Sequence, residues 1–210
     1  MKTLRVLLAF ALAFCCVQGH AQTVPTPKEF YFDEDVATTR AIVAVAGEGD
    51  AVVDRLAAAI QRRPQDVEAR AQLAGVALRS GRPELGNELY RAAQANARNN
   101  ARLLRTVSWN YGWDLYRAGE PQAAIDQWVS LLNGWPSAPS WQPPTLALGF
   151  WAVGRRDDAV RWYAAAVRTE PALWRDPANY PRLLPDWTPE EHRVLAEIRA
   201  AWEASPPAWP

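Results

Sequence analysis

Apolar side chains recur at the spacing of an α-helix along most of the chain, in runs that break at glycine and proline. Four glycines mark these breaks, at Gly47, Gly81, Gly119 and Gly154, so successive glycines stand 34, 38 and 35 residues apart. A proline stands seventeen residues after three of these four glycines. Because glycine readily ends a helix and proline cannot continue one, the period predicts a repeated unit of helix, glycine turn, helix and proline stop.

Within each unit the apolar positions fall on one face of each predicted helix. A small residue five positions after the turn glycine lets the paired helices approach closely, and a large residue nine positions after it fills the space between units. One pair cannot bury its apolar face alone, so the units have to stack. The positions before the turn are Leu73, Ala74 and Ala77, then Tyr111, Gly112 and Leu115, then Leu146, Ala147 and Phe150; those after it are Gly86 and Tyr90, Ala124 and Trp128, and Ala159 and Tyr163.

This pattern resembles the tetratricopeptide repeat (TPR), a helix–turn–helix unit with a period of about 34 residues. The resemblance implies an all-α fold, a short right-handed solenoid of helix–turn–helix repeats closed by a C-terminal capping helix. Thr39 and Arg40 stand where the first unit needs apolar and tiny residues, so that unit is degenerate. The resemblance covers residues 35–172, as units at 35–65, 66–99, 105–137 and 140–172.

Residues 1–21 have the pattern of a secretory signal peptide. Lys2 and Arg5 supply the positive start, an apolar run follows, and a small-residue cleavage site ends at Ala21. The sequence therefore predicts export to the periplasm or the cell exterior. Residues 22–34 are rich in proline and predict a partly ordered leader.

The two cysteines, Cys15 and Cys16, both lie within the predicted signal. Bulky Phe14 precedes them where a lipid-attachment signal needs a small residue, which disfavours a lipoprotein. The mature chain would then contain no disulfide, and its stability would come from packing. No later run reaches about 18 uninterrupted apolar residues, so we expect no transmembrane segment in the mature chain.

The segments that flank the last unit differ from the repeat. Four prolines predict a long loop over 133–144, between the third and fourth units. An irregular, proline-rich linker is predicted over 173–187. Residues 188–204 then predict a capping helix that begins with a capping box at Thr188, and residues 205–210 form a short tail.

Charge and residue content argue against several function classes. Without Lys2 and Arg5 the chain has 21 basic and 23 acidic residues, a net charge of minus two, which disfavours nucleic acid as a partner. His192 is the one histidine after the predicted signal, and no nucleophile, phosphate-loop or metal motif accompanies it. The sequence thus predicts no enzyme activity, cofactor or metal. Asp114 and Asp126, both near aromatic residues, keep a glycan hydrolase as a minor alternative.

A second stripe of aromatic residues stands beside the packing stripe of the third unit. All eleven tryptophans lie between residues 109 and 209, more than a repeat core requires. Trp109, Trp113 and Tyr116 follow one another at helical spacing and form a continuous ridge. The TPR resemblance implies that such positions line a concave groove that receives peptides, and the residues it selects are Trp109, Trp113, Tyr116, Arg117, Leu148, Trp151 and Arg79.

Three functions remain open at this point. The favoured prediction is a non-enzymatic module that captures a protein or peptide partner on the aromatic groove. The first alternative is a helical protein that binds or cleaves a cell-envelope glycan, since indole rings suit sugar faces. The second is a structural subunit whose groove is filled by its own chain, through Trp135, Trp141 or Trp187.

Overall fold

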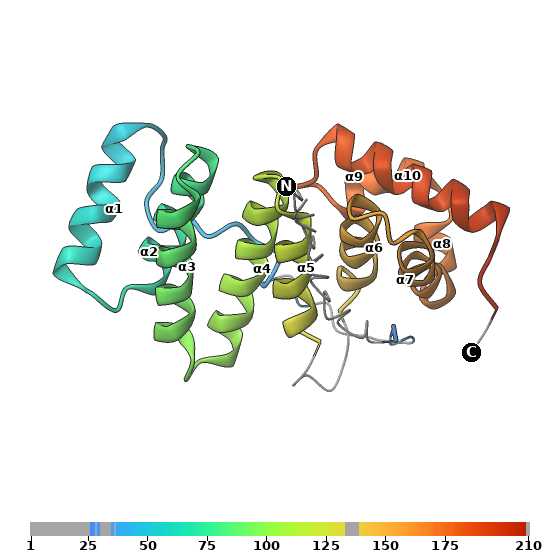
Figure 1. Cartoon of the computed structure of the whole chain (residues 1–210), viewed down its shortest axis with the longest axis horizontal. Helices are drawn as coiled ribbons and strands as arrows, with labels where there is room; N and C mark the ends of the chain where they lie inside the picture. Colours follow the sequence, from blue (N-terminus) through green and yellow to red (C-terminus); the bar gives the residue numbers. More distant parts are fainter. Residues whose placement is uncertain (1–25, 28, 30–34, 36, 133–138, 209–210) are drawn as a thin grey trace, which may run out of the picture.

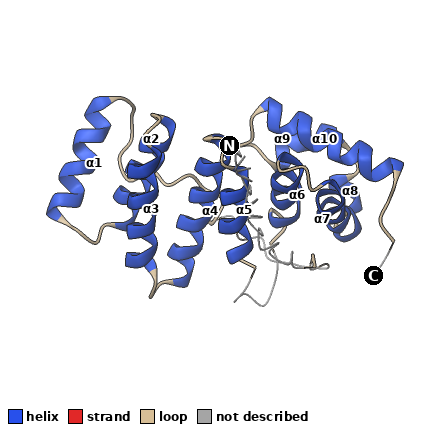
Figure 2. Ribbon diagram, in the orientation of Figure 1, coloured by secondary structure: helices blue, strands red, loops and turns tan. Residues whose placement is uncertain are grey.

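The computed structural model describes residues 26–27, 29, 35, 37–132 and 139–208. In this part of the chain every regular element is helical, as Figure 2 shows, so the expected all-α class is confirmed there. The long helices stand in a row that begins at α1 and ends at α7 and α10 (Figure 1). They are α1 (Asp50–Arg62), α2 (Val67–Arg79), α3 (Pro83–Ala97), α4 (Ala101–Arg117), α5 (Pro121–Ser130), α6 (Gln142–Ala152), α7 (Arg156–Thr169) and α10 (Pro189–Ala204).

Three successive helix pairs make up most of the row: α2 with α3, α4 with α5, and α6 with α7. A glycine with positive φ lies in each connecting turn, at Gly81 (71°), Gly119 (87°) and Gly154 (77°). Glycine adopts this left-handed conformation without a steric cost, so the chain can reverse there. Pro83 and Pro121 then start α3 and α5, where no amide donor is needed. These pairs lie where the glycine period predicts them.

The small and large positions of the repeat pack as their spacing predicts. Tyr90, Trp128 and Tyr163 are all buried between helices. Gly112 on α4 faces Trp128 on α5 so closely that a Cβ there would lie 2.2 Å from the indole nitrogen. The close approach of α4 and α5 thus depends on a position without a side chain.

The first predicted unit contains one helix instead of two. Residues 37–49 contain turns and bends but no helix, and α1 follows them. Val52 and Leu56 on α1 are buried, and the helix packs on α2. The polar Thr39 and Arg40, which weaken the repeat pattern in this stretch, lie in the non-helical segment.

Three short helical turns occupy the end of the fourth predicted unit and the linker predicted as irregular over 173–187. They are α8 (Pro171–Trp174), η1 (Pro177–Asn179) and α9 (Tyr180–Leu183). Each has a proline in its first turn, where its fixed φ favours a helical start. The Tyr163 hydroxyl lies 2.6 Å from the Tyr180 hydroxyl and also contacts the Trp174 carbonyl oxygen, which ties this linker to α7. A proline-rich stretch is therefore ordered here by the core beside it.

Helix α10 closes the last pair by packing on α6 and α7. Thr188 and Glu191 form a reciprocal capping box at its start, as the sequence predicts. Leu195 and Ile198 are fully buried in the contact. None of the helices in the part of the chain that the structure describes is long and apolar enough to cross a membrane.

Several predicted segments lie outside the described residues. These are the signal peptide at 1–21, Trp135 in the predicted loop, most of the leader at 22–34, and the end of the tail.

Candidate functional site

Trp109 and Trp113 lie side by side on α4, with ring centroids 5.9 Å apart. Both indoles are buried, with 4% and 8% of their surface exposed. Trp128 from α5 packs against both, at 6.1 Å from Trp109 and 5.2 Å from Trp113. The predicted aromatic ridge is therefore continuous with the core of its own unit.

Two tryptophans from outside the helix pair cover this ridge. Trp141, directly before α6, lies 4.1 Å from Trp109 between ring centroids, and Trp187, directly before α10, lies 5.0 Å from Trp113. Both covering rings are buried as well. The chain itself thus occupies much of the surface that these two rings would offer to a partner.

Arg117 joins the ridge to the start of α10. Its guanidinium lies 4.9 Å from the centre of the Trp113 ring, and its Nε donates to a carboxylate oxygen of Glu191 at 3.0 Å. A further donation reaches the carbonyl oxygen of Asp186 at 3.0 Å. The charge of Arg117, a residue that the TPR resemblance assigns to the groove, is therefore paired within the chain.

The other predicted site residues do not gather at one surface. Leu148 is fully buried in the core. Tyr116 packs on Trp113 and is half-buried, and this burial raises the pKa of its phenol. The Trp151 ring is covered by Arg156, and Arg79 pairs with Asp114 at 2.9 Å. Of the seven predicted residues, only Trp109, Trp113 and Arg117 line the hollow described next.

A hollow of about 340 Å³ remains where α4 meets the chain before α6 and the chain before α10. We call it the tryptophan pocket. Four indoles line it together with the Arg117 guanidinium, and the walls are completed by Thr39, Ala41, Asn110 and residues 182–186. Its lining combines four aromatic rings with polar and charged side chains, and its size lies at the lower end of the range for ligand sites. The indoles are Trp109, Trp113, Trp141 and Trp187.

Gln72 and Asn110 are functional candidates that the sequence analysis does not select. Gln72 on α2 exchanges two hydrogen bonds with the main chain of Val45, each 2.8 Å long. Asn110 on α4 accepts from the Ile42 N–H at 3.2 Å and donates to the Arg40 carbonyl oxygen at 3.0 Å. Each amide stands nine residues before its turn glycine, and this shared register is the signal in the sequence.

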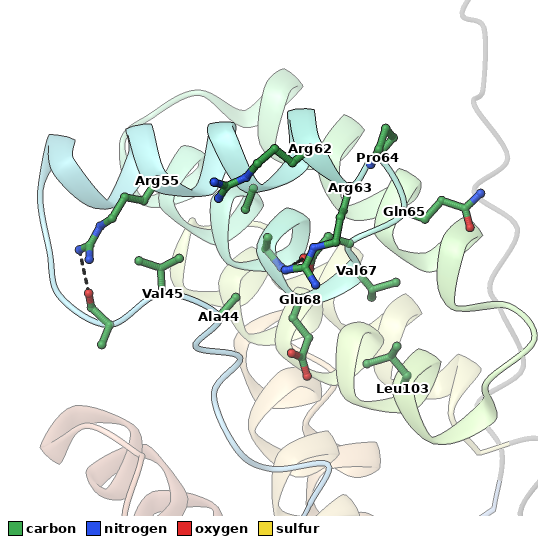
Figure 3. Close-up of a pocket in the computed structure, with 14 residues that line it drawn as sticks. Ala44, Val45, Arg55, Arg62, Arg63, Pro64, Gln65, Val67, Glu68 and Leu103 are labelled. Atoms are coloured by element: carbon green, nitrogen blue, oxygen red, sulfur yellow. Dashed lines mark hydrogen bonds and ion pairs between the residues drawn. The ribbon is translucent and has the colours of Figure 1, made fainter.

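A second and larger hollow, of about 1060 Å³, lies between α1, α2 and the segment that precedes α1 (Figure 3). Its floor contains Val45, Val67 and Leu103, and Arg62 and Arg63 stand on its rim. None of the seven predicted site residues lines it.

The acidic residues considered for catalysis are held in structural contacts. Asp114 accepts from the Tyr90 hydroxyl at 2.5 Å and pairs with Arg79. Burial, followed by the nearby Asp114 charge, raises the pKa of Tyr90 well above its ordinary value. Asp126 accepts from Gln122 of its own helix. Neither carboxylate lines the tryptophan pocket, so this arrangement does not assemble an acid–base pair there.

In comparisons with known proteins, no family model and no curated sequence matches the chain.

Proposed function

We propose that this protein is an exported, non-enzymatic interaction module built from TPR-like helix pairs, and that it binds a protein or peptide partner at the tryptophan pocket. The observation that carries the proposal is the pocket itself. Four indoles and a guanidinium from three separate segments surround a hollow that the chain leaves open. Tryptophan and arginine are the side chains most often found at the energetic centre of protein interfaces.

The pocket fits one anchoring side chain of the partner. A volume of about 340 Å³ lies at the lower end of the range for ligand sites, so the rest of the partner would lie outside it. Arg182 and Asp186 at the edge add polar groups that are available to orient a bound peptide. The apolar part of the binding free energy would come from the small area of the four indoles that still faces the hollow.

The test is a substitution that fills the pocket without removing any of its indoles. Pro185 is exposed and lines the pocket, so Pro185→Trp would place a large ring across it. Pro181 is exposed in the same linker but does not line the pocket, so Pro181→Trp is the matched control. Capture of envelope proteins by the tagged mature chain should fall strongly with Pro185→Trp and stay at the wild-type level with Pro181→Trp.

Two other outcomes would count against the proposal. Equal capture by the two variants would show that the pocket is not the binding site. Tryptophan fluorescence that responds to cell-wall fragments but not to peptides would favour the glycan alternative instead. Export is tested separately: the mature N-terminus isolated from the envelope should begin at Gln22, directly after the predicted cleavage site.

A further inference from the structure

The segment that precedes α1 is held on the surface of two helix pairs by its main chain. Gln72 bonds both the N–H and the carbonyl oxygen of Val45. Asn110 bonds the N–H of Ile42 and the carbonyl oxygen of Arg40. Residues 40–45, which contain bends but no helix, therefore lie across α2 and α4 with their main chain bonded to both helices. We call this surface the α2–α4 face.

The two side-chain amides occupy the same register in successive units, nine residues before Gly81 and Gly119. They contact main-chain groups three residues apart, at Ile42 and Val45. Three residues of chain span at most about 10 Å, which is enough to reach from one packed helix to the next. The face thus offers one amide per helix pair, at a spacing that three residues of a peptide can bridge.

Hydrogen bonds to the main chain of a bound peptide place little restriction on which side chains that peptide carries. Each primary amide has both a donor and an acceptor, so it pairs with a peptide group much as a neighbouring β-strand does. Any residue other than proline has a main-chain N–H that can donate a hydrogen bond to the side-chain oxygen of Gln72 or Asn110. A non-helical peptide with other side chains would therefore fit the same two contacts.

The side chains of the segment contribute few contacts. Arg40, Ala41, Val43 and Ala44 are exposed, and 64% of the Val43 side chain is open to solvent. Only Ile42 and Val45 are half-buried. Segments with little buried apolar surface open at a low free-energy cost, so residues 40–45 are suited to displacement.

We propose that residues 40–45 are an intramolecular ligand of the α2–α4 face. The partner is then a non-helical peptide segment that displaces them and takes over the hydrogen bonds of Gln72 and Asn110. This inference deepens the proposed function, because it names the chemistry of the partner. The two sites adjoin: Ala41 and Asn110 also line the tryptophan pocket. A peptide on the face would therefore reach the pocket with a side chain at its N-terminal end.

The first experiment opens the face without altering it. The double substitution Ile42→Pro and Val45→Pro removes the two main-chain N–H groups that donate to the side chains of Asn110 and Gln72. Val43→Pro is the matched control, because no described hydrogen bond uses the Val43 N–H. The probe is a fluorescent peptide with the sequence of residues 38–48. Its apparent Kd should be about tenfold lower for the double proline variant than for the wild type or for Val43→Pro, since the competing segment is released.

The second experiment tests the two amides. Adding Gln72→Ala and Asn110→Ala to the double proline variant should weaken peptide binding about tenfold or more, because each lost pair of hydrogen bonds contributes a factor of several. A probe with alanine at every position from 41 to 45 should retain binding within a few-fold. A probe with proline at positions 42 and 45 should lose it. Far-ultraviolet circular dichroism verifies that each variant keeps its helix content.

A measurement on the wild-type chain avoids any concern about folding. Excess unlabelled peptide should speed amide hydrogen exchange at Ile42 and Val45 of the isotope-labelled chain, because the segment is displaced. Equal affinity of all chain variants for the probe, or exchange unaffected by peptide, would overturn the inference. Binding that ignores Gln72 and Asn110 but is lost in Pro185→Trp would also overturn it, while leaving the tryptophan pocket as the partner site.

Discussion

Gly112→Ala is the substitution for which the repeat packing makes its sharpest prediction. A Cβ at this position would lie 2.2 Å from Nε1, 2.6 Å from Cδ1 and 2.7 Å from Cε2 of Trp128. The Trp128 ring is rigid and only 1% exposed. Trp109 and Trp113 pack against it, so it has no free space to move into. Either the ring or the spacing of α4 and α5 has to change.

Two effects of opposite sign set the magnitude. Alanine favours a helix over glycine by about 1 kcal/mol. Forcing a methyl group into a packed core costs about 1–3 kcal/mol, and contacts this short against a rigid ring place Gly112→Ala at the upper end. The net loss in unfolding free energy is then about 2 kcal/mol. For a chain of this size it lowers Tm by about 4–8 °C.

Gly149→Ala on α6 is the matched control, because it faces the far edge of the same indole. Its Cβ would lie 3.2 Å from Cζ3 of Trp128 and 2.9 Å from Cγ1 of the buried Ile125 side chain. These contacts are longer than those of Gly112, so the steric cost is smaller and Tm should fall by less than for Gly112→Ala. Thermal unfolding followed by circular dichroism compares the two variants. A Gly112→Ala chain as stable as the wild type would refute this packing of the helix pair.

Three further predictions concern stability. Burial raises the pKa of Tyr163, and it raises the pKa of Tyr180 to about 12. Because tyrosine in the unfolded chain ionises near pH 10, the unfolding free energy should fall as pH rises above about 10. Denaturant titrations should show a smaller fall for Tyr163→Phe. Thr188→Ala breaks the capping box and should cost about 1 kcal/mol in the same titrations. Trp187→Ala should cost about 3–5 kcal/mol and increase acrylamide quenching, because Trp113 loses its cover.

The helix pairs are predictable from the sequence because each depends on local signals. The left-handed turns need glycine, the first helical turns accept proline, and the capping box at Thr188 needs residues only three positions apart. The packing of Gly112 on Trp128 follows from the same repeat, since a small and a large residue recur at fixed distances from the turn. Signals of this kind act within one unit and repeat from unit to unit.

The site is less predictable because contacts between distant segments decide it. Helical spacing places Trp109 and Trp113 on one stripe, but nothing local shows that Trp141 and Trp187 settle on them. The degenerate repeat pattern of the first unit does not indicate that residues 40–45 cover the α2–α4 face. Only the shared register of Gln72 and Asn110 points to it, and polar residues stand on the solvent-facing side of most surface helices whether or not they bind anything.

The most direct measurement is amide hydrogen exchange at Ile42 and Val45 in the wild-type chain and in the variant with Gln72→Ala and Asn110→Ala. Both N–H groups donate to these side chains, so in the wild type they should exchange more slowly than the exposed Val43 amide. The double variant should remove this difference while α2 and α4 keep their protection. Exchange at Ile42 and Val45 as fast as at Val43 in the wild type would contradict the view that the chain occupies its own peptide-binding face.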